Sequence, residues 1–461
     1  MTSELQFSVR GKRVTVVGAA RSGVAAAELL ARRGASVTLS EMRGHLDEED
    51  RLRQAGVELE LGGHLPATLL GADLVVTSPG VPYRHPLVEA ARHAGVPVMG
   101  ELELASRWLR GRIVAITGTK GKSTTTTLTG RMLEAAGHRV LVGGNIGYAL
   151  SAQVEESTED TIHVVEASSF QLEATETFHP WIAVLLNFSA DHLDRHETVE
   201  EYAAAKTRLF ARQTDHDWAV LNADDPATLE MARHARARRL LFSMHAQLTD
   251  GIVLEGDTIV RRAGLEREPL IPVSSIRLIG PHLVADVLAA AAIAWLAGVG
   301  AAAMTRAVEG FSGLEHALEP AGEIGGVRFV NDSKATNIAA AKRAIESFDA
   351  GVVVILGGKF KGGDFRDLLA ALESRRATVV AIGESRPLIA EALGGRVAVH
   401  EAADMSGAVR TAFASAAPGG TVVLAPACAS FDMFRDYAQR GHAFKQEVRR
   451  LQEEWNVTSE Q

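Results

Sequence analysis

The chain has 461 residues, which at roughly 150 residues per domain predicts about three domains. Its composition is 46% hydrophobic and 23% charged, and this excludes a disordered chain and a disulfide-stapled miniprotein. The formal net charge of -9, from 48 Lys and Arg against 57 Asp and Glu, argues against a general affinity for nucleic acid. The single cysteine, Cys428, cannot form an internal disulfide, and the N-terminus has no apolar run like that of a signal peptide, so we expect a cytosolic protein.

One uncharged segment, residues 287–304, approaches the length of a membrane span, which needs about 20 apolar residues. About half of its residues are alanine, and Gly298 and Gly300 interrupt it. This composition predicts a buried helix that ends near Gly298. We therefore expect no membrane partner.

Apolar β-branched runs alternate with Ala-, Leu- and Arg-rich stretches of helical length, which is the pattern of parallel sheets with crossover helices. The alternation forms three blocks and predicts an α/β chain with domains at residues 1–103, 104–313 and 314–461. The predicted strands are residues 14–17, 36–39, 74–77 and 96–99, then 113–117, 162–166, 182–187 and 218–222, then 328–331, 352–356, 378–382 and 421–425. Residues 251–262 are predicted to form a hairpin that turns at Glu255, Gly256 and Asp257.

The strongest local motif follows the strand predicted at residues 113–117 and consists of Gly118, Thr119, Lys120, Gly121, Lys122, Ser123 and Thr124. Glycines after a buried strand let backbone N–H groups approach phosphate, a lysine supplies positive charge, and a serine hydroxyl can bind Mg²⁺. The strict phosphate-loop pattern has glycine where this chain has Ile116, so the motif is a variant. It predicts a nucleotide phosphate site, and a tight glycine turn without a ligand is the alternative.

A weaker glycine turn follows the strand predicted at residues 14–17. Gly18, Ala20 and Gly23 approximate the dinucleotide-binding fingerprint, and Glu41 is near the usual acidic position. The turn predicts a nucleotide or its pyrophosphate at a helix N-terminus, and a purely structural turn is the alternative. Two nucleotide sites in one chain would suit an enzyme that joins an activated nucleotide to a nucleotide-carrying substrate.

Three further residues are candidate metal ligands or catalytic groups. Glu166 and His192 are at or after strand ends beside the phosphate loop, where metal ligands are expected in a parallel sheet. Both can bind Mg²⁺ directly or through water, but a solvated glutamate and a structural histidine are the default alternatives. Lys206 lies in a predicted helix and would by itself be interpreted as a surface lysine.

In combination these motifs strongly resemble the Mur ligase family of peptidoglycan synthesis. The resemblance covers essentially the whole chain in order, and it includes residues 78–82 (SPGVP), 143–147 (GGNIG), 166–173 (EASSFQLE), 191–195 (DHLDR), 331–337 (NDSKATN), 426–432 (PACASFD) and 439–441 (QRG). It implies a Rossmann-like N-terminal domain, a central P-loop mononucleotide-binding domain and a Rossmann-like C-terminal domain. It also implies a monomeric, ATP-dependent ligase that adds D-glutamate to UDP-N-acetylmuramoyl-L-alanine through an acyl phosphate.

The resemblance further implies a role for each candidate residue. UDP would be held by Arg21, Ser22, Glu41, Met42, Arg43, Ser78 and Gly80, and the sugar-peptide by Asn145 and Ser168. The catalytic set would be Lys122, Glu166, His192, Lys206 and Lys334, with one Mg²⁺ on Ser123 and Glu166 and a second on His192 and a carbamylated Lys206. ATP would also meet Asp286 and Asp332, and glutamate would meet Thr336, Lys361, Ser430, Phe431 and Tyr437. The catalytic cleft would lie between the central and C-terminal domains.

The chain departs from the family pattern at positions that are expected to meet ATP. After residues 280–282 (GPH), the family has two asparagines where this chain has Leu283 and Asp286, and its His-Arg pair ends here in Ala317. An ionised Asp286 accepts hydrogen bonds but cannot donate them, and Ala317 removes a guanidinium. We therefore expect weaker ATP binding than the family pattern gives.

Two other functions stay open on the sequence. One is a ligase of the same fold that adds L-glutamate or another amino acid, because side-chain identity in a pocket does not determine handedness. The other is a poorly active nucleotide-binding regulator. Phosphate release that requires both UDP-N-acetylmuramoyl-L-alanine and an amino acid would distinguish an enzyme from a regulator.

Overall fold

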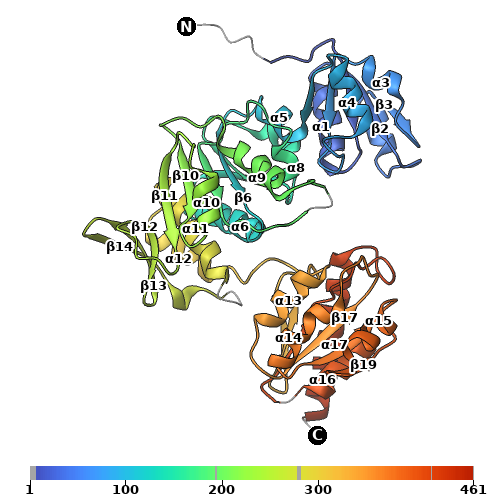
Figure 1. Ribbon diagram of the computed structural model, residues 1–461, viewed down its shortest axis with the longest axis vertical. Coiled ribbons are helices and arrows are strands. Elements are labelled where there is room, and N and C mark those ends of the chain that lie inside the picture. Colours follow the sequence, from blue (N-terminus) through green and yellow to red (C-terminus); the bar gives the residue numbers. More distant parts are fainter. Residues whose placement is uncertain (1–6, 193–194, 278–281, 417, 460–461) are drawn as a thin grey trace. The chain divides into compact units, whose positions relative to one another are not determined.

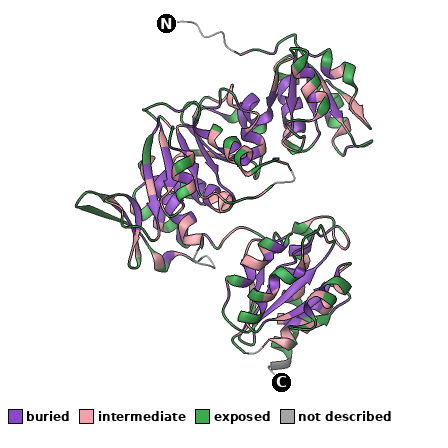
Figure 2. Cartoon of the chain, viewed as in Figure 1, coloured by how far each residue is buried: buried purple, intermediate pink, exposed green. Residues whose placement is uncertain are grey.

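The computed structural model describes residues 7–192, 195–277, 282–416 and 418–459 (Figure 1). The chain forms three separate sheets, which confirms the predicted α/β class. They belong to two compact units: one holds the first two sheets, and the other holds the third sheet and its helices from Phe311 on. In all three sheets the central strands are buried and the outer helix faces are exposed (Figure 2).

The first sheet is parallel, with the strand order β3-β2-β1-β4-β5. Its strands are β1 (Arg13–Val17), β2 (Ser36–Glu41), β3 (Val57–Leu61), β4 (Leu74–Thr77) and β5 (Val98–Gly100). Its helices are α1 (Arg21–Arg32), α2 (Glu49–Gln54), α3 (Pro66–Leu70) and α4 (Pro86–His93), and α5 (Glu101–Ser106) leads to the second sheet. The strand order reverses at β1, so a crevice forms beyond its carboxyl end, which is where such sheets bind ligands.

The second sheet has the strand order β14-β13-β12-β11-β10-β9-β6-β8-β7. Its strands are β6 (Arg112–Thr117), β7 (Arg139–Gly144), β8 (Thr161–Glu166), β9 (Ile182–Leu185), β10 (Trp218–Asn222), β11 (Arg238–Ser243), β12 (Asp250–Glu255), β13 (Thr258–Ala263) and β14 (Glu266–Pro272). Its helices are α6 (Lys122–Ala135), α7 (Leu150–Gln153), η1 (Val154–Glu156), α8 (Ser169–Leu172), α9 (Val199–Thr207), η2 (Arg208–Phe210), α10 (Pro226–Met231), η3 (Val273–Ser275), α11 (His282–Leu296) and α12 (Ala301–Glu309). Because β6 lies between β8 and β9 in parallel, the loops that follow these three strands meet at one edge.

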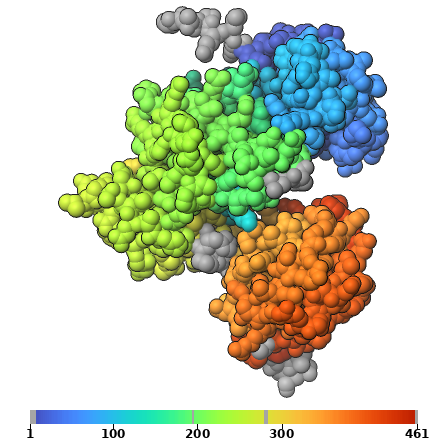
Figure 3. Space-filling model, in the orientation of Figure 1, coloured from blue at the N-terminus to red at the C-terminus, as the bar shows by residue number. Residues whose placement is uncertain are grey.

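Two local predictions for this region are confirmed. The hairpin is formed by β12 and β13, with Glu255 opposite Thr258, and strands β12 to β14 project from the surface as an antiparallel extension (Figure 3). The uncharged segment forms α11, and Val287 to Ala294 are fully buried. Among the described residues, no helix is long and apolar enough to cross a membrane.

Shared packing explains why the first two sheets form one unit. Leu29 of α1 and Leu102 of α5 belong to the same buried cluster as Ala115 of β6. The buried Glu103 carboxylate on α5 accepts hydrogen bonds from the backbone N–H groups of Thr177 and Phe178 in the second domain. A hydrophobic contact and a buried polar contact therefore both hold the first sheet against the second.

The third sheet has the order β15-β16-β20-β17-β18-β19 and is parallel except for the β15–β16 pair. Its strands are β15 (Glu319–Ile324), β16 (Val327–Asn331), β17 (Val352–Gly357), β18 (Thr378–Ile382), β19 (Ala398–Glu401) and β20 (Thr421–Leu424). Its helices are α13 (Ile338–Glu346), η4 (Phe365–Leu368), α14 (Leu369–Ser374), α15 (Arg386–Leu393), α16 (Met405–Ser415) and α17 (Tyr437–Ser459). The sequence predicted the central strands except β11, together with the edge strand β5, and missed the edge strands β3, β7, β14, β15 and β19. Most of the missed edge strands, such as β3 and β15, lack a continuous apolar run because one of their sides is open to solvent.

Candidate active site

The phosphate loop follows β6 and is fixed to the loop that follows β9. The backbone N–H of Thr119 donates to the carbonyl of Asn187 at 3.1 Å. The Asn187 side chain accepts from the Lys120 N–H at 2.9 Å and donates to the Lys120 carbonyl at 3.1 Å. Asn187 therefore holds the loop, a role that the sequence analysis did not assign although the residue is the last of a predicted strand.

The lysine of the loop and a buried carboxyl group hold the start of α6. Lys122 Nζ donates to the carbonyls of Gly118 and Thr119, both at 2.9 Å. Gly121 has φ +79°, and a Cβ there would lie 2.1 Å from Asp286 Oδ1, so the carboxyl group of Asp286 occupies the space beside this glycine. Only glycine fits this position.

Burial raises the pKa of Asp286 well above its ordinary value, and the Lys122 ammonium opposes the shift only in part. A protonated carboxyl group donates as well as accepts a hydrogen bond. The sequence analysis treated this aspartate as ionised and therefore as an acceptor only, whereas its burial favours the protonated form. In that form Asp286 has the hydrogen-bonding capacity of the asparagine in the family pattern.

Lys206 on α9 is a buried residue with 1% exposure, so its interpretation as a surface lysine is wrong. Its Nζ donates to the carbonyl of Gly118 at 2.9 Å and lies 4.6 Å from the centre of the Tyr202 ring. Burial and the Lys122 ammonium lower the pKa of Lys206 to about 6, although the carboxylates of Asp191 and Glu166 act in the opposite direction. A large share of this amine is therefore neutral at pH 7.

Glu166 ends β8 and is 2% exposed. Its Oε1 accepts from Asn145 Nδ2 at 2.7 Å, whereas its Oε2 is buried and has no hydrogen-bond partner among the described residues. A buried carboxylate oxygen without a donor is costly, so it indicates a missing cation or donor. The sequence analysis assigned Asn145 to the sugar-peptide and did not predict this hydrogen bond to Glu166.

His192 lies in the loop after β9 and has φ +55°, in the left-handed region. Its exposed ring lies edge-on to Phe170, with ring centres 5.0 Å apart, and 6.2 Å from the Tyr202 ring centre. Two residues of this motif, Leu193 and Asp194, lie outside the described residues, as do residues 280 and 281 of the motif before α11.

The glycine turn of the first sheet is closed by Gly23 and by an acidic side chain. A Cβ on Gly23 would lie 1.8 Å from the carbonyl oxygen of Gly18, so only glycine fits. Glu41 Oε2 accepts from the Ala19 N–H at 2.6 Å, and its Oε1 accepts from the Arg43 N–H at 3.1 Å. Burial alone would raise the pKa of Glu41, but these hydrogen bonds and the Arg43 guanidinium hold it below its ordinary value. Both carboxylate oxygens are thus engaged inside the turn.

A cavity of about 680 Å³ opens beside this turn. Its lining includes six residues predicted to bind UDP, together with two histidines that the sequence analysis missed: Arg21, Glu41, Met42, Arg43, Ser78, Gly80, His64 and His85. A second cavity of about 130 Å³ shares Arg21, Ser78 and Gly80 with the first and adds Ser22, Asn145 and Gln171. Since the two cavities share residues, they are adjacent, and together they extend from the first sheet to the edge of the second.

Ser168 is the one predicted UDP-substrate residue that lines neither cavity. It begins α8 as an N-cap, where its hydroxyl accepts from the Gln171 N–H and the Gln171 side chain bonds back to the Ser168 N–H. Gln171 Nε2 is buried without a partner among the described residues, and Gln171 lines the second cavity. The Ser-x-x-Gln spacing of a capping box was the available signal for Gln171.

The residues predicted to meet ATP and glutamate in the third domain lie on loops after β16, β17 and β20, which are neighbouring strands. The β17 and β20 loops are joined through Lys359 and Ala429, which exchange backbone hydrogen bonds at 2.9 and 3.0 Å. These loops and the start of α17 carry the predicted set: Asp332, Lys334, Thr336, Lys361, Ser430, Phe431 and Tyr437. Ser430 is buried, whereas Lys334, Lys361, Phe431 and Tyr437 are exposed.

Asp332 and Arg440 are the buried ionisable groups of this edge. Burial raises the pKa of Asp332 to about 7, against the hydrogen bond from the Leu318 N–H and the charge of Lys334. Arg440 donates to the hydroxyl and carbonyl of Ser333 and to the carbonyl of Cys428, so it joins the β16 and β20 loops. The sequence analysis assigned no role to Arg440 beyond its motif.

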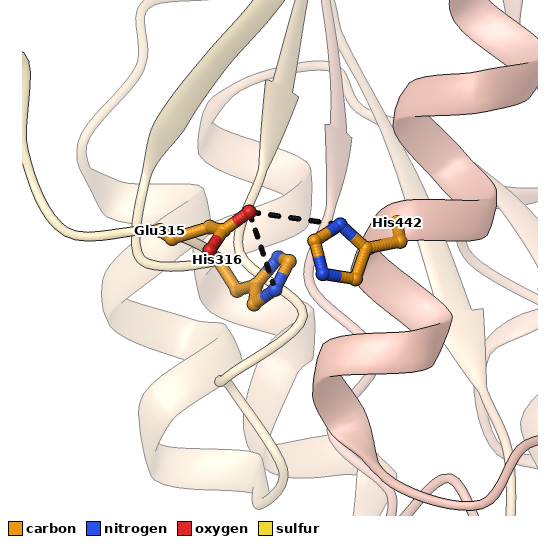
Figure 4. A group of neighbouring side chains, drawn as sticks. All are labelled: Glu315, His316 and His442. Atoms are coloured by element: carbon orange, nitrogen blue, oxygen red, sulfur yellow. Dashed lines mark ion pairs between the residues drawn. The ribbon is translucent and has the colours of Figure 1, made fainter. Parts of the chain in front are cut away.

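Glu315, His316 and His442 form a cluster whose potential ligand atoms lie within 4.8 Å of one another (Figure 4). Glu315 Oε1 lies 3.9 Å from His316 Nε2 and 3.6 Å from His442 Nδ1, and it also accepts from Lys445 Nζ at 2.7 Å. His316 Nδ1 faces Asn331 Nδ2 at 2.9 Å, and an amide nitrogen can only donate, so the proton of the neutral ring is on Nε2. A metal would need the lone pair of Nε2, and we therefore interpret the cluster as an ion-pair network between this loop and α17.

Three segments of the chain match domains of one family. Residues 12–100 match the Mur ligase MurD-like N-terminal domain, residues 116–294 the Mur ligase middle domain, and residues 318–428 the Mur ligase glutamate ligase domain. Two curated relatives carry the name UDP-N-acetylmuramoylalanine–D-glutamate ligase. The protein of Acidobacterium capsulatum is 48% identical over 95% of this chain and 96% of its own length, and that of Koribacter versatilis is 43% identical over 97% and 99%.

Solved structures show the same fold at low sequence identity. The UDP-N-acetylmuramate-alanine ligase MurC of Thermotoga maritima has a TM-score of 0.60 at 18% identity and covers 96% of this chain and 100% of that chain. The pseudomurein peptide ligase type C of Methanothermus fervidus has a TM-score of 0.58 at 16% identity, with the same coverage.

Proposed function

This chain belongs to the Mur ligase family, and we propose that it is an ATP-dependent ligase that joins D-glutamate to UDP-N-acetylmuramoyl-L-alanine in the synthesis of peptidoglycan precursors. The observation that carries the proposal is the row of two adjacent cavities. It begins at the glycine turn of the first sheet and reaches Asn145, which is hydrogen-bonded to Glu166 at the edge that also holds the phosphate loop. A nucleotide-linked substrate lying in this path would bring its far end toward ATP.

The first domain supplies the groups for the UDP part. Arg21 and Ser22 are at the N-terminus of α1, where backbone N–H groups and the helix dipole favour a diphosphate. Arg43 adds a second guanidinium on the wall of the cavity. Asn145 and the unpartnered amide of Gln171 would then meet the sugar-peptide, whereas Ser168 contributes as the cap that orients Gln171.

The central domain fits Mg-ATP. Gly118 and Gly121 leave room for backbone approach, and Lys122 supplies positive charge beside Ser123, whose hydroxyl is a magnesium ligand of the usual type. The unpartnered Glu166 Oε2 fits the need of a cation for an anionic oxygen. Bound Mg²⁺ neutralises the crowded phosphate oxygens.

As a ligand of a second Mg²⁺, Lys206 is better suited in its carbamylated form than as a free ammonium. Its pKa of about 6 provides the neutral amine that must attack CO₂, and burial protects the product from solvent. A carbamate offers anionic oxygens to a second Mg²⁺ that His192 would share, whereas an ammonium would repel it. Tyr202 holds this position, since its ring packs on Lys206 and its hydroxyl donates to Thr119 Oγ1 at 3.3 Å.

The chemistry follows from the need to activate a carboxylate. An oxygen of the alanine carboxylate attacks the γ-phosphorus of ATP, ADP leaves, and an acyl phosphate forms, with Lys122 stabilising the transferred charge. The glutamate amine then attacks the acyl carbon, inorganic phosphate leaves, and the nitrogen loses its proton to give the amide. Exclusion of water would protect the acyl phosphate.

The third domain would supply the glutamate and part of the ATP contacts. Asp332 and Lys334 would meet ATP, and Thr336, Lys361, Ser430, Phe431 and Tyr437 would surround glutamate, with Lys361 as the point charge for a carboxylate. We place the enzyme in the cytosol as a monomer, in line with its single buried thiol.

The test is phosphate release from ATP with UDP-N-acetylmuramoyl-L-alanine and a panel of amino acids that includes both glutamate enantiomers. Release should require the nucleotide substrate and D-glutamate together. Release with L-glutamate alone would support the alternative ligase, and binding of both nucleotides without turnover would support a regulator. With ¹⁸O in the alanine carboxylate, label should appear in the released phosphate; its absence would contradict the acyl phosphate.

A further inference from the structure

His64 lies on the wall of the larger cavity, in the segment between β3 and α3. Its ring packs edge-on against that of His85, with the ring centres 5.8 Å apart and the planes at 89°. Neither histidine belongs to the glycine turn or to the acidic position that the fingerprint predicts. Both nevertheless face the space in which the nucleotide part of the substrate would lie.

A chain of hydrogen bonds fixes the proton of the His64 ring. The Ser40 hydroxyl donates to Glu60 Oε1 at 2.5 Å, and the same Glu60 oxygen accepts from the Leu65 N–H at 2.9 Å. Burial alone would raise the pKa of Glu60, but the hydrogen bonds from Leu65, Ser40 and Thr68 hold it below its ordinary value, so the group is a carboxylate that only accepts.

The Ser40 hydroxyl has one proton, and it is given to Glu60. Toward His64 Nδ1, which lies 2.8 Å away, the same oxygen must therefore accept, and Nδ1 carries the ring proton. Burial and the neighbouring His85 lower the pKa of His64, which favours the neutral ring, although Glu41 and Glu60 oppose the shift. In the neutral ring Nε2 is then a hydrogen-bond acceptor held in a fixed orientation.

The other acceptors of the cavity are less available. Both carboxylate oxygens of Glu41 are engaged by the Ala19 and Arg43 N–H groups. Asp47 and Glu48 also line the cavity, but both are carboxylates at least partly open to solvent. His64 Nε2 therefore offers a neutral, oriented acceptor in a cavity whose other groups near the turn are mainly cations and backbone N–H donors.

We propose that His64 is a specificity-determining residue for the nucleoside part of the substrate, whose N–H or O–H group donates a hydrogen bond to His64 Nε2. This rests on the proposed function, since a nucleoside diphosphate must occupy the cavity. The donor is either the uracil N3–H or a ribose hydroxyl, both of which the ligand presents as neutral donors. Ser40 is the positioning residue, because it acts only through the ring proton.

The test is calorimetric titration of the full-length protein with UDP, 2′-deoxy-UDP, 3′-deoxy-UDP and N3-methyl-UDP. His64→Phe keeps an aromatic ring but removes the acceptor, and it should weaken UDP binding by roughly three- to tenfold. Each analogue lacks one candidate donor. The analogue that lacks the true donor should have the same affinity for wild type and His64→Phe, and this result identifies the donor. The matched control His93→Phe, on the exposed end of α4, should bind all four ligands like wild type.

Ser40→Ala provides a second route that leaves His64 in place. It should weaken UDP binding less than His64→Phe does, because the His64 ring still populates the Nδ1–H tautomer part of the time. The same analogue should again be the one whose affinity does not change. If His64→Phe fails to fold, as thermal melting would show, the Ser40→Ala series decides the question. Equal UDP affinity in wild type and the variants, or a loss that is the same for every analogue, would overturn the proposal. A wild-type protein that binds no UDP at all would instead overturn the proposed function.

Discussion

Two glycine turns follow the first strands of the first two sheets, and they differ in the charge at their centre. In the first turn, the backbone N–H of Ala19 is bonded to the carboxylate of Glu41. In the second, two lysines, Lys122 and Lys206, donate to the same carbonyl of Gly118. The backbone conformation at the start of the two turns is similar, because each turn begins with a glycine of positive φ. The angle is +89° at Gly18 and +157° at Gly118.

The difference shows that glycine geometry lets a ligand approach, whereas the side chains around the turn determine which part of a ligand fits. An internal carboxylate already neutralises part of the first turn, and the flanking arginines, Arg21 and Arg43, suit a diphosphate that passes along it. Among the described residues, the second turn has no carboxylate bonded to its backbone N–H groups, and it holds the Lys122 ammonium, which suits a triphosphate whose charge grows in the transition state.

The largest expected effect comes from removing the lysine charge of the second turn, which tests whether the two turns act independently. Lys122→Ala should lower turnover by about 10²- to 10³-fold, because a charge at the transferred phosphate is lost. UDP binding, measured by calorimetry, should change less than about twofold, since the first turn is untouched. Lys12→Ala, an exposed lysine before β1, is the matched control. Loss of UDP affinity in Lys122→Ala would show that the turns are not independent.

The second lysine tests the modification. Lys206→Ala should reduce turnover on the order of a hundredfold, and acetate should restore part of it by occupying the vacated position. Burial and Lys122 lower the pKa of the unmodified amine to about 6, so the neutral form grows as the pH rises through 6. At a fixed concentration of dissolved CO₂, recovery of CO₂-depleted wild type should therefore be faster above pH 6 than below it. Near-wild-type turnover of Lys206→Ala in bicarbonate-free buffer would contradict both the carbamate and the second metal.

Substitution of the glycines in the two turns should lower the free energy of unfolding by different amounts. Gly23→Ala meets a backbone carbonyl oxygen at 1.8 Å, and Gly121→Ala meets the side-chain oxygen of Asp286 at 2.1 Å and has φ +79°. A side chain can shift more easily than backbone, so we expect losses of about 3–4 kcal/mol for Gly23→Ala and about 2 kcal/mol for Gly121→Ala. Urea unfolding measures both. Gly95→Ala, where no atom lies within 4 Å, is the control for positive φ alone. A larger loss in Gly121→Ala would mean that Asp286 is as rigid as the backbone.

The absent guanidinium can be restored. The family pattern has an arginine where this chain has Ala317, and a charge-assisted phosphate contact is worth roughly 1.5–3 kcal/mol. Ala317→Arg should therefore lower the KM for ATP by about tenfold and leave UDP binding unchanged. An unchanged or higher KM would mean that another residue fills the role or that the contact is not made.

The smallest effect is expected at Asp286. Burial raises the pKa of Asp286 well above its ordinary value and so favours the neutral carboxyl group, and Asp286→Asn keeps the size of that group and its capacity to donate and accept. The KM for ATP of this variant should lie within about twofold of wild type between pH 6 and 8. Asp286→Leu should raise the KM severalfold, since the polar group beside Gly121 is lost. A strong improvement in Asp286→Asn at pH 8 would show that the aspartate is ionised.

The central strands apart from β11, the two glycine turns and the loops that carry chemistry could be predicted from the sequence alone. These features are local: an apolar β-branched run is buried in any parallel sheet, and a glycine that follows it permits a tight turn. The α11 helix could be predicted for the same reason. Its alanine-rich composition and the Gly298 that follows it are local features of one segment of the sequence. Edge strands such as β3 and β19 escaped prediction because half of their environment is solvent.

The environment of the polar groups, by contrast, follows from the packing of the folded chain. Lys206 meets Gly118 across 88 residues of sequence, and its pKa follows from that burial. Asp286 reaches Gly121 from α11, and its burial there favours the neutral carboxyl group over the ionised acceptor that the sequence analysis assumed. Ser40, Glu60 and His64 carry no recognisable motif, yet their contacts orient a ring toward the cavity. Protonation and hydrogen-bond direction depend on which groups the fold brings together, and residue type and spacing alone do not contain that information.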